Sequence, residues 1–287
     1  MRVLVTGANG QLGTELVDLY GARADDEVLG VDLPDLDITA SDSVASSFSS
    51  FSPDVVINCA AWTAVDAAEE NEDSALIVNG DGPRVLAQAC RDAGAWLVQV
   101  STDYVFSGDA TSPYDEVATP DPRSAYGRTK LVGEIAVQEE LPDAHYIVRT
   151  AWLYGHEGNN FVKTMMRLES ERDTIDVVDD QIGQPTYAAD LAAQIVSLVD
   201  ARPVAGIFHG TNSGQVSWFG FTQEIFRLIG ADPSRVRPVT SEQFVRPAPR
   251  PAYSVLGHDR WAEVGLTEMR DWRAAIAEAI DAGFAAT

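Results

Sequence analysis

Three features of the sequence predict an α/β fold built on a doubly wound parallel sheet. Short β-branched and aliphatic runs alternate with helical patterns through the first two-thirds of the chain. The strand candidates are apolar throughout, which is typical of parallel strands that helices cover on both faces. A glycine-rich turn, TGANGQLG at residues 6–13, joins the first strand candidate to the first helix. Right-handed crossovers between such strands give a doubly wound sheet.

The expected elements follow in chain order. The strand candidates are residues 2–6, 27–31, 54–58, 96–100 and 145–149. The helical patterns between them are residues 11–21, 41–50, 72–93 and 124–140. The last third has one strand candidate at 206–210 and helical patterns at 161–168, 188–199, 218–230 and 269–280. The proline-rich segment 246–253 fits neither a regular helix nor a central strand.

The composition excludes some classes of partner. The 287 residues include 44 acidic and 20 basic side chains, which gives a formal charge of -24. Such a charge repels nucleic acid and anionic membrane surfaces, so we expect neither as a partner. The acids are dispersed and lysine is nearly absent, which favours a halophilic protein kept soluble in a salty cytoplasm. An ordinary acidic cytosolic protein is the alternative.

The compartment is predicted from the cysteines and the hydropathy. Cys59 and Cys90 lie in apolar contexts without the spacing of a zinc site. No stretch approaches the ~20 apolar residues that a membrane span needs. We therefore expect a cytoplasmic protein with reduced thiols.

The glycine-rich turn predicts a dinucleotide site. Gly7, Gly10 and Gly13 are three residues apart, at a strand-to-helix junction. Glycines there permit a tight turn, the close approach of a pyrophosphate and packing of the helix on the strand. Gln11 and Leu12 begin the helix beside the same loop. A glycine turn without a ligand is the alternative to a Rossmann-type NAD(P)-binding domain.

Further cofactor residues are expected after the next two strands. Asp32 falls about 20 residues after the loop, where an acid commonly bonds the adenosine ribose. Asp37 and Ile38 could flank the adenine, and a turn acid is the alternative for Asp32. The small residues expected to leave space for the cofactor are Ala60, Ala61 and Thr63.

The predicted domains follow from this placement. Residues 1–150 are expected to form the NAD(P)-binding domain, to which later segments near 174–210 return. Residues 151–173 and 211–287 are expected to form a smaller α/β substrate-binding domain.

A tyrosine and a lysine predict the chemistry. The chain contains only two lysines, and Lys130 lies four residues after Tyr126 in a helical pattern, so both side chains reach one face. We expect the ammonium, helped by the charge of a bound nicotinamide, to lower the tyrosine pKa from its ordinary value near ~10 toward neutrality. Such a phenol exchanges a proton with a ketone or an alcohol. A chance pair on an exposed helix face is the alternative.

A hydroxyl for the substrate carbonyl is expected after the strand candidate at 96–100. Thr102 is the candidate, and Ser101 is its nearest rival. Asp103 reaches the substrate or serves as a turn acid.

The combination of three glycines, Thr102, Tyr126 and Lys130 resembles the extended short-chain dehydrogenase/reductase superfamily. Within it, the chain is similar to the dTDP-4-dehydrorhamnose reductase family from the first residues to about residue 260, with less similarity after residue 212. The strings that carry the similarity are TGANGQLG, AAWTAVDAAE, STDYVF, YGRTKLVGE, RTAWLYG, GNNFVKTM and DQIGQPTYAADLA.

The resemblance implies an activity. Members of the family use NADPH or NADH to reduce the C4 ketone of dTDP-4-dehydro-6-deoxy-L-mannose (dTDP-4-dehydrorhamnose) to dTDP-L-rhamnose. Tyr126 would donate the proton, Lys130 would hold the nicotinamide ribose, and Thr102 would bind the carbonyl. The residues implied to lie near sugar, cofactor or diphosphate are Val65, Trp152, Asn160 and Arg250.

The resemblance also implies a homodimer. Some relatives bind Mg²⁺ at a dimer contact through glutamates. Glu15 matches one of these positions, whereas Asp190 matches only loosely, so no metal ligand is assigned.

Alternatives remain for the function and for single residues. Close relatives reduce or epimerise other nucleotide sugars, and one is a non-catalytic regulatory subunit of methionine adenosyltransferase. Lys163 is expected to meet the substrate diphosphate or to form a structural ion pair. Arg250 could brace its proline-rich loop, and Trp152 could be a core aromatic residue instead of a platform for the sugar.

Overall fold

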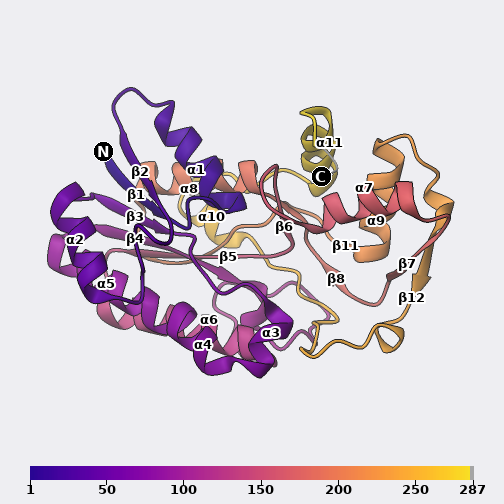
Figure 1. Ribbon diagram of the computed structural model, residues 1–287, viewed down its shortest axis with the longest axis horizontal. Helices are drawn as coiled ribbons and strands as arrows, with labels where there is room; N and C mark the ends of the chain where they lie inside the picture. The colour runs from indigo at the N-terminus through magenta and orange to yellow at the C-terminus, as the bar shows by residue number, and fades with distance from the viewer. Residues whose placement is uncertain (285–287) are drawn as a thin grey trace.

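The computed structural model describes residues 1–284, and its larger part is a six-stranded sheet (Figure 1). The strands are β1 (Arg2–Thr6), β2 (Glu27–Val31), β3 (Val55–Asn58), β4 (Trp96–Thr102), β5 (His145–Thr150) and β10 (Gly206–His209). Their order is β10-β5-β4-β3-β1-β2, and every neighbouring pair is parallel. The doubly wound parallel sheet predicted from the sequence is confirmed.

Helices cover both faces of this sheet, as Figure 1 shows. Val3 and Val5 face α1 (Gln11–Gly21) and α8 (Ala188–Ala201), whereas Leu4 between them faces the opposite layer. The helices of that opposite layer are α2 (Ser41–Phe51), α5 (Gly82–Ala93) and α6 (Ala125–Glu140). Side chains alternate between faces along a strand, so continuous apolar runs produce two cores, one on each side.

Short helical segments stand between the main elements. The chain from β3 to α5 contains α3 (Val65–Glu70), α4 (Glu72–Leu76) and a π-helical turn (Ile77–Asp81). A 3₁₀ turn at Asp103–Val105 follows β4 directly. Each of these lies after the carboxyl end of a strand, at the edge where ligands bind in sheets of this type.

A smaller region packs beside the sheet and has its own core. Its helices are α7 (Phe161–Glu171), α9 (Trp218–Leu228) and α11 (Trp272–Asp281). Its strands pair in twos, β6 (Leu153–Tyr154) with β9 (Thr186–Tyr187), β7 (Ile175–Val178) with β12 (Val236–Val239), and β8 (Ile182–Gly183) with β11 (Val216–Ser217). Further 3₁₀ turns lie at Pro233–Arg235 and Ser241–Gln243.

This pairing divides the segment 174–210 between the two regions. Residues Ile175–Val178 pair with Val236–Val239 in the smaller region, while α8 and β10 belong to the large sheet. We therefore propose that the smaller domain extends to residue 187 and that the chain returns to the larger domain with α8.

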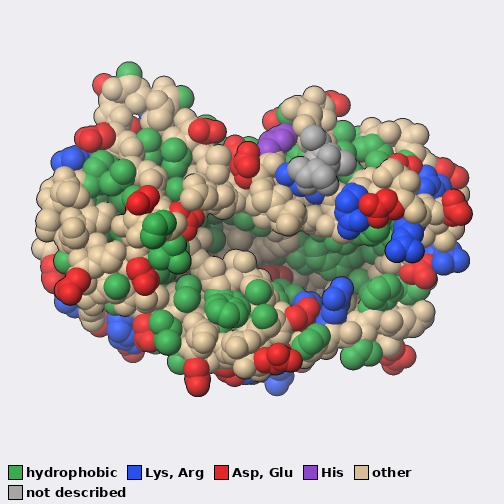
Figure 2. All heavy atoms as spheres, viewed as in Figure 1, with side chains coloured by type: hydrophobic (Ala, Val, Ile, Leu, Met, Phe, Trp, Pro, Cys, Tyr) green, Lys and Arg blue, Asp and Glu red, His purple; other side chains and the backbone are tan. Residues whose placement is uncertain are grey.

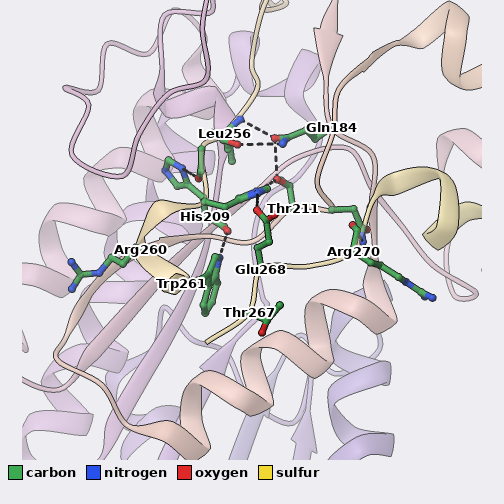
Figure 3. Close-up of polar contacts among 12 residues, drawn as sticks. Gln184, His209, Thr211, Leu256, Arg260, Trp261, Thr267, Glu268 and Arg270 are labelled. Carbon is green, nitrogen blue, oxygen red and sulfur yellow. Dashed lines mark hydrogen bonds and ion pairs between the residues drawn. The ribbon is translucent and has the colours of Figure 1, made fainter. Parts of the chain in front are cut away.

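The segment that precedes α11, which includes Leu256 and Trp261, is hydrogen-bonded to both regions (Figure 3). The side-chain amide of Gln184 accepts from the Leu256 N–H at 2.8 Å and donates to the Leu256 carbonyl at 3.2 Å. The Thr211 hydroxyl donates to the same Gln184 oxygen at 2.9 Å. On α10 (Asp259–Glu263), the Trp261 indole N–H donates to the His209 carbonyl at 2.8 Å, so the C-terminal segment joins the end of β8 to the edge strand β10.

The surface is hollowed between the two regions, and apolar side chains gather on the right-hand part of this hollow in Figure 2. No helix within residues 1–284 combines the length and the apolar character needed to cross a membrane.

Candidate active site

The glycine loop has the geometry of a cradle for a ligand. Gly7 has a φ of 67°, and a Cβ atom there would lie 2.6 Å from the main-chain nitrogen of Ala60. A Cβ atom at Gly13 would overlap the carbonyl oxygen of Gly7. Gly10 is the N-cap of α1 and offers no capping side chain, so the first-turn N–H groups remain available to an anion.

This loop forms one wall of a cavity of about 460 Å³. The structure brings together in its lining most of the residues predicted for cofactor and catalysis. These residues are Gly7, Gly10, Gln11, Leu12, Ala61, Thr63, Val65, Thr102, Asp103, Tyr126, Lys130 and Trp152.

A second cavity of about 500 Å³ adjoins the first. Tyr104 and Trp152 line both, so the two spaces form the two ends of one cleft. The second end is walled by aromatic and aliphatic side chains, including Phe161 and Trp218, together with Arg246 and Arg250. Asp66 and Asp176 also line this end. Aromatic walls suit a flat base, and the two arginines suit an anionic diphosphate.

Helix α6 places Tyr126 in its first turn. The Ser124 hydroxyl caps the helix by accepting from the Gly127 N–H at 3.1 Å. The Ala125 N–H donates to the Glu69 carboxylate of α3 at 2.8 Å. Gly127 has no Cβ, which allows the helix to pack against the Tyr104 carbonyl. The start of α6 is thus fixed against the residues that follow β3 and β4.

Lys130 is buried one turn later. Its ammonium donates to the main-chain oxygen of Val100 at 2.7 Å, and the residue is only 4% exposed. Burial lowers the pKa of Lys130 to about 8, although Glu134 and Cys59 act in the opposite direction. A buried lysine with a pKa near neutrality is uncommon outside functional sites.

The Tyr126 phenol does not show the predicted effect of the lysine. Burial raises the pKa of Tyr126 to about 12, the Thr102 hydroxyl lowers it, and Asp103 raises it further. The expectation that Lys130 lowers this pKa is therefore wrong for the protein alone. The lysine is not among the groups that shift the phenol, because loss of hydration dominates and the ammonium is bonded to Val100.

Asp103 lines the same cavity as Tyr126. It is 2% exposed, and its Oδ1 atom accepts from the Thr102 hydroxyl at 3.0 Å. Burial raises the pKa of Asp103 to about 6, while the neighbouring Ser254 and Thr102 side chains lower it. Its Oδ2 atom, the Ser101 hydroxyl and the Thr150 hydroxyl are buried without a partner among the described residues, and all three residues line the first cavity. Buried polar groups of this kind call for a polar ligand.

Four predicted cofactor residues lie outside the lining of either cavity. Asp32 accepts from the Asn9 N–H of the glycine loop at 3.3 Å, beside the expected ribose site. The Asp37 carboxylate accepts from Thr39 within its own turn. Ile38 is 5% exposed and belongs to the core, and Ala60 contributes only its backbone against Gly7.

Of three further residues predicted for the substrate, one lines the second cavity and two line neither cavity. Arg250 lines the second cavity, where it pairs with the Asp66 carboxylate at 2.9 Å. Asn160 caps α7 through the Lys163 N–H and donates to the Gln11 side chain at 3.1 Å. Lys163 lines neither cavity, and its ammonium donates to the His156 carbonyl at 2.6 Å.

The carboxylate of Asp190, one of the two residues considered for a metal, is already paired. Asp190 is held by two hydrogen bonds of 2.8 Å from the Arg270 guanidinium and one of 2.7 Å from Asn212. Within residues 1–284, no group of three or more His, Cys, Asp or Glu side chains could hold a metal ion.

Several cleft residues were not singled out from the sequence. They are Tyr104, Phe161, Trp218 and Arg246. Tyr104 immediately follows Thr102 and Asp103, so the end of a strand was a usable signal. The others come from α7, from α9 and from an irregular loop, and only the tertiary structure brings them to the cleft.

Comparison with known proteins agrees with this geometry. The model of the RmlD substrate binding domain family matches residues 1–284. This chain belongs to that family. This chain is 53% identical to the dTDP-4-dehydrorhamnose reductase of Streptomyces griseus over 285 residues. The match covers 98% of this chain and 93% of the relative.

Two further proteins similar to this chain are a reductase named for a different keto sugar and a reductase solved with a bound cofactor. The dTDP-4-keto-6-deoxy-D-glucose reductase of Streptomyces niveus is 51% identical over 278 residues, covering 97% of this chain and 96% of the relative. The crystal structure of dTDP-4-dehydrorhamnose reductase from Bacillus anthracis in complex with NADP is 41% identical. It superposes with a TM-score of 0.93 and covers 98% of this chain and 99% of that one.

Proposed function

We propose that this chain is an NAD(P)H-dependent oxidoreductase that reduces the C4 ketone of dTDP-4-dehydrorhamnose to dTDP-L-rhamnose. The observation that carries the proposal is the joining of two cavities at Trp152 and Tyr104. One contains the glycine loop with Tyr126 and Lys130, and the other combines aromatic walls with arginines. A dinucleotide and a nucleotide sugar can therefore meet at the phenol.

The first cavity fits a nicotinamide dinucleotide. The glycine loop leaves room that a Cβ atom would fill, and the uncapped start of α1 suits a pyrophosphate. Buried hydroxyls of Ser101 and Thr150 lack partners in the same lining. When bound, the reduced nicotinamide supplies hydride to the ketone carbon.

Tyr126 is the proposed proton donor. With a pKa of about 12 the phenol is protonated at neutral pH, so it can give its proton to the ketone oxygen as the carbon accepts hydride. The ketone thus becomes an alcohol, and the phenolate that remains lies in the same cavity as the Lys130 ammonium. Lys130 also holds the nicotinamide ribose in this proposal.

Thr102 and Asp103 complete the oxyanion side of the site. The Thr102 hydroxyl donates to Asp103 at 3.0 Å, so binding a substrate carbonyl requires it to rotate away from that carboxylate. Asp103 then remains as an acceptor for a sugar hydroxyl. Hydrogen-bond donors aimed at the oxygen that gains charge stabilise the transition state of such a reduction.

The second cavity is the proposed site for the thymidine diphosphate. Arg250 is its candidate anchor, and its present partner Asp66 keeps the guanidinium inside the cleft. Lys163 has a weaker claim on the diphosphate because its ammonium is bonded to a carbonyl outside both cavities.

A second candidate substrate is the C4 ketone of dTDP-4-keto-6-deoxy-D-glucose. The relative from Streptomyces niveus favours it at 51% identity, close to the value for the Streptomyces griseus reductase. The two ketones differ in sugar stereochemistry. Contacts of the sugar with Trp152 and Val65 would distinguish between them.

We also propose that the chain is a cytoplasmic homodimer. Both proposals rest on the resemblance to the family described above and on the soluble substrates of the reaction. Light scattering of the purified chain tests the dimer.

The test of the function is a coupled comparison of substrates. Loss of NADPH and of NADH absorbance is followed with dTDP-4-dehydrorhamnose, with dTDP-4-keto-6-deoxy-D-glucose and with UDP- or GDP-linked keto sugars. The proposal expects the first to have the highest kcat/KM, with dTDP-L-rhamnose identified as the product by NMR. Faster reduction of the second sugar would favour the second candidate. Turnover of none, with NADPH still bound, would indicate a non-catalytic relative.

A further inference from the structure

Trp152 has an unusual backbone conformation at the junction of the two cavities. Its φ is 46°, in the left-handed region that residues with a Cβ atom rarely adopt. The residue lines both ends of the cleft and is half-buried. A strained residue persists only where its surroundings hold it, and such residues concentrate at functional sites.

Trp218 is the principal contact that holds the Trp152 ring. The two indoles stack with their ring centroids 3.5 Å apart and their planes at 11°. Phe161 packs against Trp218 at 4.3 Å with its plane tilted by 48°. Trp218 is the first residue of α9, and the Ser217 hydroxyl caps that helix by accepting from the Gly220 N–H at 3.0 Å. The stack is therefore anchored at a well-defined helix start.

Gly183 provides a second contact to the same ring. A Cβ atom at Gly183 would lie 2.6 Å from Cε2 and 2.7 Å from Cζ2 of Trp152. Gly183 pairs with Val216 between β8 and β11, and Trp218 directly follows β11, so both contacts to the indole are connected through this small sheet.

The position of Gly183 is itself fixed by its neighbour. Gln184 is 2% exposed, and its side chain bonds the Leu256 backbone in both directions and accepts from Thr211 (Figure 3). The backbone beside the indole therefore has little freedom to move.

We propose that Trp218 is a positioning residue for the substrate, which acts by holding the Trp152 indole where the sugar ring passes between the two cavities. The inference rests on the proposed function, since it takes the ligand to be a nucleotide sugar. Trp218 touches the far side of the cleft, but its effect on the sugar is exerted through Trp152. Gly183 supports the same arrangement.

The stack differs from an ordinary core pair. Both indoles are half-buried and line the cleft, whereas Trp96 and Tyr146 stack at 4.9 Å at the opposite end of the sheet and line neither cavity. Trp96→Ala is therefore a matched control for the loss of a tryptophan that is stacked on another aromatic ring.

A double-mutant cycle tests the inference by binding. Affinities for dTDP-L-rhamnose and for dTDP are measured by calorimetry for wild type, Trp152→Ala, Trp218→Ala and the double variant. Trp218→Ala is expected to weaken dTDP-L-rhamnose binding about fivefold or more, given the strength of aromatic pairs. It is expected to weaken dTDP binding less, since Trp218 also lines the cavity proposed for the nucleotide. The ratio of the affinities for dTDP-L-rhamnose and dTDP should be the same in the double variant as in Trp152→Ala, because Trp218 acts on the sugar through that ring.

Two further variants sharpen the readout. Trp218→Phe keeps an aromatic face and should restore most of the affinity for the sugar nucleotide. Gly183→Ala should displace the indole and reproduce the loss seen in Trp218→Ala. Thermal unfolding of each variant, compared with Trp96→Ala, verifies that it is folded.

Two outcomes would overturn the inference. One is an additive cycle, in which Trp218→Ala lowers the ratio of the affinities for dTDP-L-rhamnose and dTDP as much without Trp152 as with it. The other is an equal loss for dTDP and dTDP-L-rhamnose, which would place the effect of Trp218 on the nucleotide alone. Failure of the proposed function is distinct, since it would show as absence of turnover by the wild type while the binding cycle is still measurable.

Discussion

Lys130 lies one turn after Tyr126 in α6, and its ammonium donates a hydrogen bond of 2.7 Å to the main-chain oxygen of Val100. Val100 belongs to β4, the strand that ends in Thr102. One hydrogen bond therefore ties the helix that carries the phenol to the strand that carries the hydroxyl. This arrangement gives the lysine a positional role in addition to its proposed contact with the cofactor.

The first prediction concerns Lys130→Arg. A guanidinium is larger than an ammonium and does not fit the buried contact with Val100, so we expect kcat/KM to fall about a hundredfold. Fluorescence titration should also show weaker NADPH binding. A variant with wild-type kinetics and affinity would remove the reason for a lysine at this position.

The pH profile of the wild type provides a second test of Lys130. Burial lowers its pKa from 10.5 to about 8, so the ammonium is lost as pH rises through about 8. We expect kcat/KM to decline above that pH. The decline should be absent in Lys130→Arg, because arginine stays charged. A wild-type profile that is flat to about pH 10, near the ordinary lysine pKa, would contradict this assignment.

Asp103 predicts a pH dependence of stability. Its pKa is raised from 3.8 to about 6, so the folded state binds the proton more tightly than the unfolded state. Its contribution to the free energy of unfolding is therefore unfavourable above about pH 6 and diminishes as pH falls toward 4. Asp103→Asn should be more stable than wild type near pH 8, by about 2 kcal/mol or less, and the difference should shrink toward pH 5. Urea unfolding at several pH values measures this stability difference, and Asp35→Asn at an exposed position is the control. A stability difference between Asp103→Asn and wild type that stays constant across pH would contradict the prediction.

Gly7 predicts the effect of a side chain in the cofactor loop. Gly7 and Gly94 both have positive φ, 67° and 70° respectively. A Cβ atom at Gly7 would clash with the backbone of Ala60, whereas a Cβ atom at Gly94 would have no neighbour within 4 Å. Both alanine variants should lose about 1 kcal/mol of stability or more from backbone strain. Only Gly7→Ala should also abolish NADPH binding in a fluorescence titration. Equal NADPH affinity in the two variants would argue against the loop as the cofactor cradle.

Arg250 is expected to bind the substrate and not the cofactor. Arg250→Ala should raise the KM for the dTDP sugar about tenfold, since a charged hydrogen bond to a diphosphate is lost. The affinity for NADPH should not change. The control is Arg167→Ala on the exposed side of α7, where the arginine pairs only with Glu171. If both variants have the same KM, Arg250 only braces its loop.

The larger domain was predictable because its signals are local. Residues 2–6, 11–21 and 27–31 have the bounds expected from the sequence, since each apolar run is long enough to show its period. The two-residue strands β6, β8, β9 and β11 are too short to show any period. The pairing of Ile175–Val178 with Val236–Val239 joins distant segments, and no local pattern reveals it.

The candidate site was predicted unevenly for the same reason. Tyr126 and Lys130 were visible because four residues along a helix place two side chains on one face. Trp218 reaches the cleft only because β11 pairs with β8, so its own surroundings in the sequence carry no sign of the contact with Trp152. The pKa of Tyr126 depends mainly on its burial. The four-residue spacing of Tyr126 and Lys130 gives no information on how deeply either side chain is buried.

The central claim is that the Tyr126 phenol gives its proton to the sugar ketone, and Tyr126→Phe tests it most directly. The variant keeps the ring that packs edge-on against Tyr104 at 5.6 Å and loses only the hydroxyl. Single-turnover reduction of dTDP-4-dehydrorhamnose should slow by about a hundredfold or more, with NADPH affinity within about twofold of wild type. A single-turnover rate close to that of the wild type would contradict the account.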